Sequence, residues 1–180
     1  MSLDPLPVES ERLILRRLDL GDIDRFQAYR CDPEVGRYQG WQVLSLDEAT
    51  AFLIEMSQAV AFVPGLWFQI GIADRPTGDL IGDIGVCVSS DETYAEVGFT
   101  LSGKWQGKGL ATEAILALIS HLFATTNVER IEANTDASNL ASIRLLERVG
   151  MERVETVDAI FRGEPCEEHL YELRRPPQSD

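Results

Sequence analysis

The chain has 180 residues, enough for one domain with a full hydrophobic core, and its composition of 44% hydrophobic and 26% charged residues excludes a disordered protein. Its 16 basic and 30 acidic side chains give a net charge of −14, which argues against nucleic acid as a partner, because that binding depends on clustered Lys and Arg. A field of this sign attracts protonated amines, although an acidic surface that only keeps the protein soluble would carry the same charge.

Signals for a membrane, for secretion or for a metal are missing from the sequence. No apolar run approaches the roughly 20 residues that cross a bilayer, and the N-terminus lacks the basic start and apolar stretch of a secretory signal. We therefore expect a cytoplasmic protein with no membrane partner. Cys31, Cys87 and Cys166 form no CxxC pair, and His121 and His169 have no second ligand at metal spacing, so we expect reduced thiols and no metal.

The first third of the chain predicts one strand and two helices. Residues 13–18 (LILRRL) have the composition of a strand, and residues 22–30 form a short helix capped from Asp19 or Gly21. Ser45 followed by Glu48 has the spacing of a capping box, which begins a helix that runs to about Val60.

Three strands without an intervening helix come next, at residues 67–73, 80–89 and 94–101. The connections between them, RPTGD and SSDE, are short and rich in turn-forming residues. Short connections imply antiparallel neighbours, so this part of the chain predicts a meander.

The second half predicts helices alternating with strands. A helix of about four turns begins near Leu110, because apolar residues recur there at every fourth position. A strand at residues 128–134 precedes a helix that Ser138 or Asn139 caps and Gly150 ends. The remaining elements are two strands joined by a turn, at residues 154–161 and 166–173.

These elements define the fold class. Their order, β-α-α-β-β-β-α-β-α-β-β, combines an antiparallel meander with a central strand–helix–strand crossover. We therefore expect an α/β (α+β) fold, with a mixed, mostly antiparallel sheet of about seven strands and about four helices on both faces. No repeat or flexible linker interrupts the chain, so one domain spans residues 1–180, with its core at about 8–174.

The most informative segment is residues 95–114, AEVGFTLSGKWQGKGLATEA. A strand ends near Leu101, a glycine-rich loop follows, and a helix opens at about Leu110. Glycines let backbone N–H groups approach a ligand, and a helix N-terminus adds partial positive charge. Lys104 and Lys108 flank the loop in an otherwise acidic protein, so the segment predicts an anion-binding site.

Three known loop patterns compete for this segment. A Walker A loop fails, because only three residues separate Gly103 from Gly107-Lys108 and Gly109 replaces the Ser or Thr that holds magnesium. A dinucleotide fingerprint is weak, because Thr112 stands where its third glycine belongs and a meander precedes it. The segment Gln106-Gly107-Lys108-Gly109-Leu110-Ala111 matches every fixed position of Q/R-x-x-G-x-G/A, the pyrophosphate loop of the GNAT acetyltransferases. A glycine-rich turn that only joins strand to helix is the alternative.

The resemblance extends over nearly the whole chain, and the chain is similar to the RimJ/RimL-type branch of that family. Residues 9–18 (ESERLILRRL) resemble its opening strand, and residues 31–41 (CDPEVGRYQGW) its segment between the first two helices. Residues 139–151 (NLASIRLLERVGM) fit its N-x-x-S-x-x-L-x-x-x-G-F/M helix, and residues 167–174 (EEHLYELR) resemble its closing strand.

The resemblance implies acetyl-coenzyme A as donor and direct attack of a substrate amine on the thioester in a ternary complex. It also implies that the strand ending at Leu101 splays from residues 128–134, which frees backbone N–H groups for the pantetheine amides. The Phe99 N–H would polarise the thioester carbonyl. The diphosphate would lie on the N–H groups of residues 106–111. The residues expected at the coenzyme are Phe99, Thr100, Leu101, Gln106, Gly107, Lys108, Gly109, Leu110, Ala111, Thr112, Asn139 and Ser142.

Candidates for proton transfer follow from the chemistry, because an ammonium has no lone pair and must lose a proton before attack. Glu96 is the leading base, on the strand that splays; the alternative is a solvated carboxylate on an outward position. Asp83 and Asp158 are weaker candidates.

The leaving thiolate benefits from a proton donor, for which many GNAT enzymes use a Tyr at the position of Leu146. Ser142 is the replacement candidate; the alternative is a small residue that lets the helix pack closely. His169 and Tyr171 on the last strand are further candidates, with a structural role as the alternative for a lone His.

The segments that contact the acceptor differ from those that bind the coenzyme. The resemblance places acceptor specificity at roughly residues 22–60 and 155–167. These segments carry acids, so we expect a cationic amine, either a protein N-terminus or a small amine. Trp41, Trp67 and Trp105 are candidates for the core or the acceptor pocket. The acids are Asp22, Asp24, Glu48, Glu55, Glu155, Asp158 and Glu164.

Two other functions stay open at this point. The missing Tyr favours a GNAT-fold module that binds acyl-coenzyme A without catalysis, and residues 107–112 leave a nicotinamide-dependent oxidoreductase as a second alternative. The oligomeric state is also open, although a homodimer is common in proteins of this type.

Overall fold

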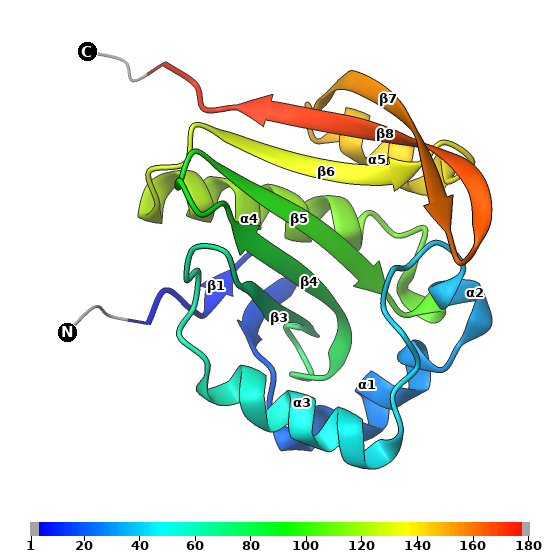
Figure 1. The fold of residues 1–180 in the computed structure, drawn as a ribbon. Coiled ribbons are helices and arrows are strands. Elements are labelled where there is room, and N and C mark those ends of the chain that lie inside the picture. The colour runs from blue at the N-terminus through cyan, green and yellow to red at the C-terminus, as the bar shows by residue number, and fades with distance from the viewer. Residues whose placement is uncertain (1–3, 178–180) are drawn as a thin grey trace.

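A computed structural model describes residues 4–177. Its strands form one sheet in the order β1-β2-β3-β4-β5-β6-β8-β7 (Figure 1). Every neighbouring pair is antiparallel except β5 and β6, which run parallel. The predicted meander and crossover are therefore confirmed, and a two-residue strand at the N-terminal edge is added to the seven expected. The strands are β1 (Val8–Glu9), β2 (Leu13–Arg17), β3 (Trp67–Asp74), β4 (Leu80–Val88), β5 (Tyr94–Leu101), β6 (Arg130–Asp136), β7 (Glu152–Phe161) and β8 (Glu164–Arg174).

Most helices follow the sequence signals, but Asp19 caps the 3₁₀ turn η1 rather than α1, whose N-cap residue Asp22 makes no side-chain capping bond. Ser45 and Glu48 form the expected capping box at α3, and Asn139, not Ser138, caps α5 by accepting a hydrogen bond from the Ser142 N–H. A single turn, α2, was not expected; Asp32 caps it and its proline occupies the first turn. The helices are α1 (Ile23–Arg30), α2 (Pro33–Gly36), α3 (Leu46–Gln58), α4 (Leu110–Thr125) and α5 (Leu140–Arg148), with 3₁₀ turns η1 (Leu20–Asp22) and η2 (Gly103–Trp105).

Helices cover both faces of the sheet, as the register shows. Asp83 on β4 contacts α1, whereas Tyr171 on β8 contacts α5. Tracing the paired residues across β5 and β6 places Tyr171 on the face opposite to Asp83. The central strand β4 is accordingly almost wholly buried, β3 is buried at five of its eight residues, and β7 at the edge is almost wholly exposed.

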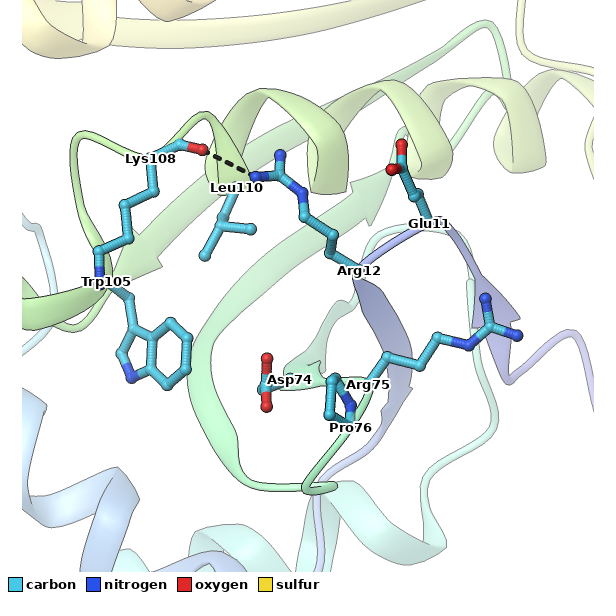
Figure 2. Close-up of a pocket in the computed structure, with 8 residues that line it drawn as sticks. All are labelled: Glu11, Arg12, Asp74, Arg75, Pro76, Trp105, Lys108 and Leu110. Atoms are coloured by element: carbon cyan, nitrogen blue, oxygen red, sulfur yellow. Dashed lines mark hydrogen bonds between the residues drawn. The ribbon is translucent and has the colours of Figure 1, made fainter.

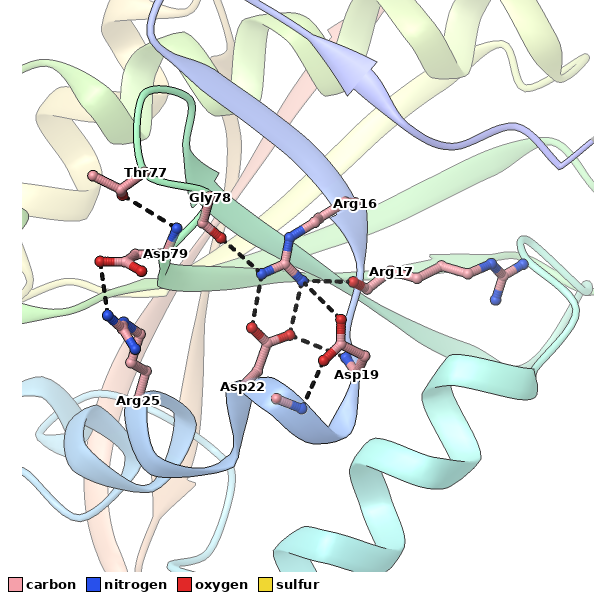
Figure 3. A network of polar contacts seen from close by, with 9 residues as sticks. Arg16, Arg17, Asp19, Asp22, Arg25, Thr77, Gly78 and Asp79 are labelled. Carbon is pink, nitrogen blue, oxygen red and sulfur yellow. Dashed lines mark hydrogen bonds and ion pairs between the residues drawn. The ribbon is translucent and has the colours of Figure 1, made fainter.

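An ion-pair network holds the connection from β2 to α1 (Figure 3). Arg16 donates through both terminal nitrogens to the buried Asp22, at 2.8 and 2.7 Å, and to the Gly78 carbonyl at 3.1 Å. Asp22 also accepts from the Asp19 N–H, so the carboxylate is fully engaged. Two-point pairing of this kind is geometrically specific, and it fixes where α1 begins relative to the sheet.

Candidate active site

The sheet opens between β5 and β6. Their parallel pairing covers only Tyr94–Glu96 and Arg130–Glu132, and the two strands then diverge. Each continues with its other neighbour, β5 with β4 as far as Leu101 and β6 with β8 as far as Asp136. The opening is therefore a property of one strand pair within an otherwise continuous sheet, and it lies where the sequence led us to expect it.

The backbone of β5 alternates in direction, which decides what it offers to this opening. The Tyr94 carbonyl accepts from the Ser89 N–H, and the Ser102 N–H donates to the Ile81 carbonyl, so the even-numbered residues bond to β4. Thr100 belongs to that set. Its peptide groups face β4 rather than the opening, which corrects its expected role as a main-chain ligand of the pantetheine.

The odd-numbered residues Phe99 and Leu101 direct their N–H and carbonyl groups away from β4 and toward the opening. Two glutamines occupy the carbonyls: Gln39 Nε2 donates to Phe99 O at 3.1 Å, and Gln106 Nε2 donates to Leu101 O at 2.8 Å. Both contacts come from outside the strand, on the side that β6 leaves. The N–H groups of Phe99 and Leu101 therefore point into the same space.

The glycine loop presents the N-terminus of α4 without a side-chain cap. Gly109 occupies the N-cap position in a left-handed conformation, with φ 76°, and Gly107 has φ 73°. In the helix, the first backbone bond is that of the Glu113 N–H to the Gly109 carbonyl at 3.1 Å. The N–H groups of the three residues between them thus have no intrahelical acceptor. By contrast, serine and asparagine side chains cap α3 and α5.

Gln106 differs from the rest of the expected loop residues. Its backbone N–H donates to the Gly103 carbonyl at 3.2 Å, so that N–H is not free for a ligand. Its side chain instead ties the loop to the end of β5, as described above. Gln106 therefore joins the loop to the strand, and the free donors begin after it.

Cationic, acidic and apolar residues line a cavity of about 420 Å³ beside this loop (Figure 2). Lys108 Nζ lies 5.1 Å from the centre of the Trp105 ring, and the Arg12 guanidinium donates to the Lys108 carbonyl at 3.0 Å. Trp105 is thus placed at the cavity beside the glycine loop. The lining residues are Glu11, Arg12, Asp74, Arg75, Pro76, Trp105, Lys108 and Leu110.

The start of α5 carries the two residues expected on the far wall. Asn139 Oδ1 accepts from the Ser142 N–H at 3.2 Å, and both residues are half-buried. Leu146, at the position where the resemblance led us to look for a Tyr, is fully buried in the core. A hydroxyl from that helix can therefore come from Ser142 but not from position 146.

Glu96 lies at the point where β5 and β6 separate. Its side chain is half-buried and accepts a hydrogen bond from Asn134 Nδ2 on β6 at 3.2 Å. Cys87 is its partner across the β4–β5 ladder. Burial, together with the charge of Glu96, raises the pKa of the Cys87 thiol, so this sulfur stays neutral.

Asp83 occupies the same face of the sheet as Glu96 but is locked in the core. Arg30 donates to both of its oxygens at 2.9 and 2.8 Å, Gln69 Nε2 donates at 2.7 Å, and Tyr29 donates its hydroxyl. Burial, reinforced by the charge of Asp83, raises the pKa of Tyr29 well above its usual value, which keeps the phenol protonated as a donor. With its lone pairs taken in this way, Asp83 is an internal ion-pair partner rather than a base.

The remaining acid–base candidates lie on the C-terminal hairpin. His169 is buried between Thr156, 2.9 Å from Nδ1, and Arg153, 3.3 Å from Nε2. Tyr171 is buried and donates to Glu147 on α5 at 3.4 Å. Asp158 is exposed on β7. These contacts give His169 and Tyr171 structural roles in holding β7, β8 and α5 together.

The other two tryptophans lie on the N-terminal side of the opening. Trp41 Nε1 lies 3.4 Å from Thr100 Oγ1, and the Arg30 guanidinium stacks 4.5 Å from its ring centre. Trp67 is 52% exposed and lies across the β3–β4 ladder from Cys87, which in turn faces Glu96. Trp67 and Glu96 thus share one row on one face of the sheet.

Residues 4–177 contain no group of three or more His, Cys, Asp or Glu side chains that could hold a metal ion. Within that same range, no helix combines the length and apolar composition needed to cross a bilayer.

Sequence comparison supports one family. The model of the acetyltransferase (GNAT) domain matches residues 12–152. The chain is 31% identical over 145 residues to the uncharacterized N-acetyltransferase p20 of Bacillus licheniformis, covering 80% of this chain and 81% of that protein. It is also 34% identical over 91 residues to the ribosomal protein uS5-alanine N-acetyltransferase of Escherichia coli, covering 49% of this chain and 47% of that protein.

Solved structures agree on the fold. A GNAT-family acetyltransferase from Bacillus anthracis superposes with a TM-score of 0.84 at 23% identity, covering 94% of this chain and 98% of that one. RimL, a ribosomal L7/L12 alpha-N-protein acetyltransferase in complex with coenzyme A, superposes with a TM-score of 0.80 at 15% identity, covering 94% and 98%.

Proposed function

The chain belongs to the GNAT acetyltransferases, in the branch related to the ribosomal-protein N-acetyltransferases, and from this we propose that it moves the acetyl group of acetyl-coenzyme A to a primary amine by direct attack in a ternary complex. The observation that carries the proposal is the uncapped N-terminus of α4 beside the free edge of β5. One feature binds an anion and the other binds amides, and the coenzyme combines both along one chain.

The residues around the loop fit a diphosphate. The N–H groups of Leu110, Ala111 and Thr112 are unpaired within α4, and the helix dipole makes this end partly positive. No atom lies within 4 Å of the space that a Cβ at Gly107 would fill, so the loop is open on that side. Lys108, which also lines the neighbouring cavity, adds positive charge. We assign the diphosphate to this turn.

The edge of β5 fits the pantetheine arm and the reacting carbonyl. Phe99 and Leu101 offer N–H groups to the opening, and in this mechanism the Phe99 N–H polarises the thioester carbonyl as an oxyanion-type donor. Gln39 occupies the Phe99 carbonyl at 3.1 Å, where a pantetheine amide would donate. The pantetheine arm therefore replaces the Gln39 contact, or Gln39 stays and lines the arm.

Glu96 is the base in this proposal. The amine must lose a proton before attack, and a carboxylate at the mouth of the opening receives it directly or through water. Asn134 fixes the carboxylate with a single hydrogen bond, which leaves lone pairs for the amine. The neutral Cys87 thiol next to it argues for direct transfer rather than an acyl-cysteine intermediate, because the thiolate is the nucleophile.

Ser142 is the proposed hydrogen-bond donor to the departing sulfur. It lies in the first turn of α5 and is half-buried. A buried leucine at position 146 favours a second candidate function, an acyl-coenzyme A-binding module without turnover. Both functions share the coenzyme site, and only one releases thiol.

We propose a cationic amine as the acceptor, such as the N-terminus of a protein. RimL acts on the N-terminus of a ribosomal protein, and the net charge of −14 favours a positive partner. The row from Trp67 through Cys87 to Glu96 forms one wall of the proposed acceptor side.

The test is calorimetry with coenzyme A followed by thiol release from acetyl-coenzyme A with peptides, polyamines and aminoglycosides. We expect micromolar binding and turnover with at least one cationic class. Glu96→Gln should bind coenzyme A like the wild type and lose turnover. Binding without thiol release for any amine supports the binding module, and absence of coenzyme binding removes both functions.

A further inference from the structure

A polar cluster joins the start of β2 to the first turn of α4, although the two lie about a hundred residues apart. Glu113 Oε1 accepts from the Ser10 hydroxyl and from the Arg12 N–H, each at 2.7 Å, and Glu113 Oε2 accepts from Arg12 Nε at 2.7 Å. The Arg12 Nη1 group then donates to the Lys108 carbonyl at 3.0 Å (Figure 2). One guanidinium thus bridges the helix and the glycine loop.

The contact with Lys108 determines how the next peptide group is oriented. In a planar trans peptide the C=O and the following N–H point in opposite directions. With the Lys108 carbonyl held toward Arg12, the Gly109 N–H points away from the guanidinium and is left for an acceptor on the other side. Gly109 needs its left-handed φ of 76° to continue from this peptide into the helix.

The same guanidinium also balances an unfavourable charge. Glu113 lies in the first turn of α4, where its negative charge offsets the partial positive charge that an anion would meet. Burial raises the pKa of Glu113, but the hydrogen bonds from Arg12 and Ser10 outweigh that effect and lower it, so the carboxylate is ionised. Arg12, paired with it at 2.7 Å, cancels this charge locally.

We propose that Arg12 is a positioning residue for the coenzyme diphosphate: it orients the Lys108–Gly109 peptide and neutralises Glu113, so that the first turn of α4 presents donors to an anion. This inference rests on the proposed function, since it assigns the diphosphate to that turn. Arg12 itself does not need to touch the ligand. Its side chain is about half exposed, with 47% accessible, so it is no core residue whose loss must unfold the chain.

Arg75 provides a matched control. It lines the same cavity, its side chain is also 47% exposed, and it forms a similar surface ion pair, with Glu9 at 2.9 Å. It also donates to the Ser10 carbonyl at 2.9 Å, but within residues 4–177 it forms no hydrogen bond or ion pair with Lys108 or Glu113. Arg12→Gln and Arg75→Gln therefore remove the same charge from the same cavity, and only the first removes the peptide anchor.

The experiment titrates wild type, Arg12→Gln, Arg75→Gln and Arg12→Lys with coenzyme A and with pantetheine, which lacks the diphosphate. We expect Arg12→Gln to weaken coenzyme A binding roughly ten- to a hundredfold, as the loss of a charge-assisted interaction implies, and to leave pantetheine binding within about twofold. Arg75→Gln should change neither by more than about twofold. Arg12→Lys should recover only part of the loss, because an ammonium cannot make the forked contacts.

The outcomes distinguish failure of the proposed function from failure of the role assigned to Arg12. Failure of the wild type to bind coenzyme A removes the proposed function. If the wild type binds coenzyme A and both glutamine variants lose affinity equally, Arg12 is one charge among several. If Arg12→Gln loses affinity for coenzyme A and pantetheine in parallel, Arg12 only stabilises the fold. Either result overturns the inference. If circular dichroism shows that Arg12→Gln does not fold, the coenzyme A affinity of Arg12→Lys tests the inference instead. An affinity equal to that of the wild type would overturn it.

Discussion

The two edges of β5 differ in one respect that organises the molecule. Toward β4 its backbone is paired from Ala95 to Leu101, and toward β6 the pairing ends at Glu96. The same strand is therefore structural along one edge and, along the other, left with N–H groups at Phe99 and Leu101 that the sheet does not use. An unpaired strand edge inside a protein is costly unless something else satisfies it. We infer that a ligand does.

Two acids on one face of the sheet follow the same division. Asp83 on β4 is fully buried and accepts from Arg30, Tyr29 and Gln69, whereas Glu96 on β5 is half-buried and accepts from Asn134. Composition and strand alternation make the two positions equivalent. Helix α1 supplies Tyr29 and Arg30 to Asp83 but no partner to Glu96. Asp83 is therefore a stabilising ion-pair partner, and Glu96 is a candidate base.

The largest effect is expected on catalysis, from Glu96 beside the opening between β5 and β6. Glu96→Gln keeps the shape and the Asn134 contact but removes the proton acceptor, and should lower kcat/KM by about 10²- to 10⁴-fold. The free energy of unfolding should change by less than about 1 kcal/mol, because the side chain is half exposed. Steady-state kinetics and urea unfolding measure the two quantities. Wild-type kcat/KM across pH in the variant would show that another group takes the proton.

Replacing Asp83, on the paired side of β5, should lower the stability of the fold. Asp83→Asn leaves the Arg30 charge buried without a counter-ion, which should lower the free energy of unfolding by about 3–5 kcal/mol. Urea denaturation followed by tryptophan fluorescence measures it. Should Asp83→Asn prove as stable as the wild type while Glu96→Gln unfolds, our contrast between the two acids would be reversed.

The glycine loop allows an intermediate test within one segment. Gly109 has φ 76°, so Gly109→Ala places a side chain in the left-handed region at a cost of about 1–2 kcal/mol. Gly103 is the control: its φ is not positive, and a Cβ there would come no closer than 3.9 Å to Asp32 Oδ2. Coenzyme A affinity should fall several-fold in Gly109→Ala and stay near wild type in Gly103→Ala. Equal losses would indicate that loop flexibility, not the left-handed turn, matters.

The smallest expected effect concerns pH. Because hydrogen bonds from Arg12 and Ser10 lower the pKa of Glu113, its ionised form stabilises the folded state at neutral pH, and this contribution is lost as pH falls below its unfolded value of about 4.3 and through the lowered folded value. Glu113→Gln should therefore be less stable than the wild type at pH 7 and approach it near pH 3. A stability difference independent of pH would mean that the carboxylate charge contributes nothing.

The sequence by itself determined the features that depend on residues close together in the chain. The order of the elements, the antiparallel meander, the capping box at Ser45 and the helix that follows Gly109 all depend on residues within a few positions of one another. Their apolar spacing and turn residues act in the chain before it is folded. For the same reason the anion-binding character of the glycine loop was predictable: the helix end and the left-handed glycines are both local features.

Only the tertiary structure decided which residues act together. Arg12 meets Glu113 and Lys108, Gln39 reaches Phe99, and Arg30 closes on Asp83 across separations of about 50 to 100 residues. None of these pairs has a spacing that a pattern could detect. Register and helix docking bring them together, because a one-residue shift of a strand would turn each side chain to the other face. The direction of the Thr100 peptide, which we expected at the opening, was settled in the same way by its pairing with β4.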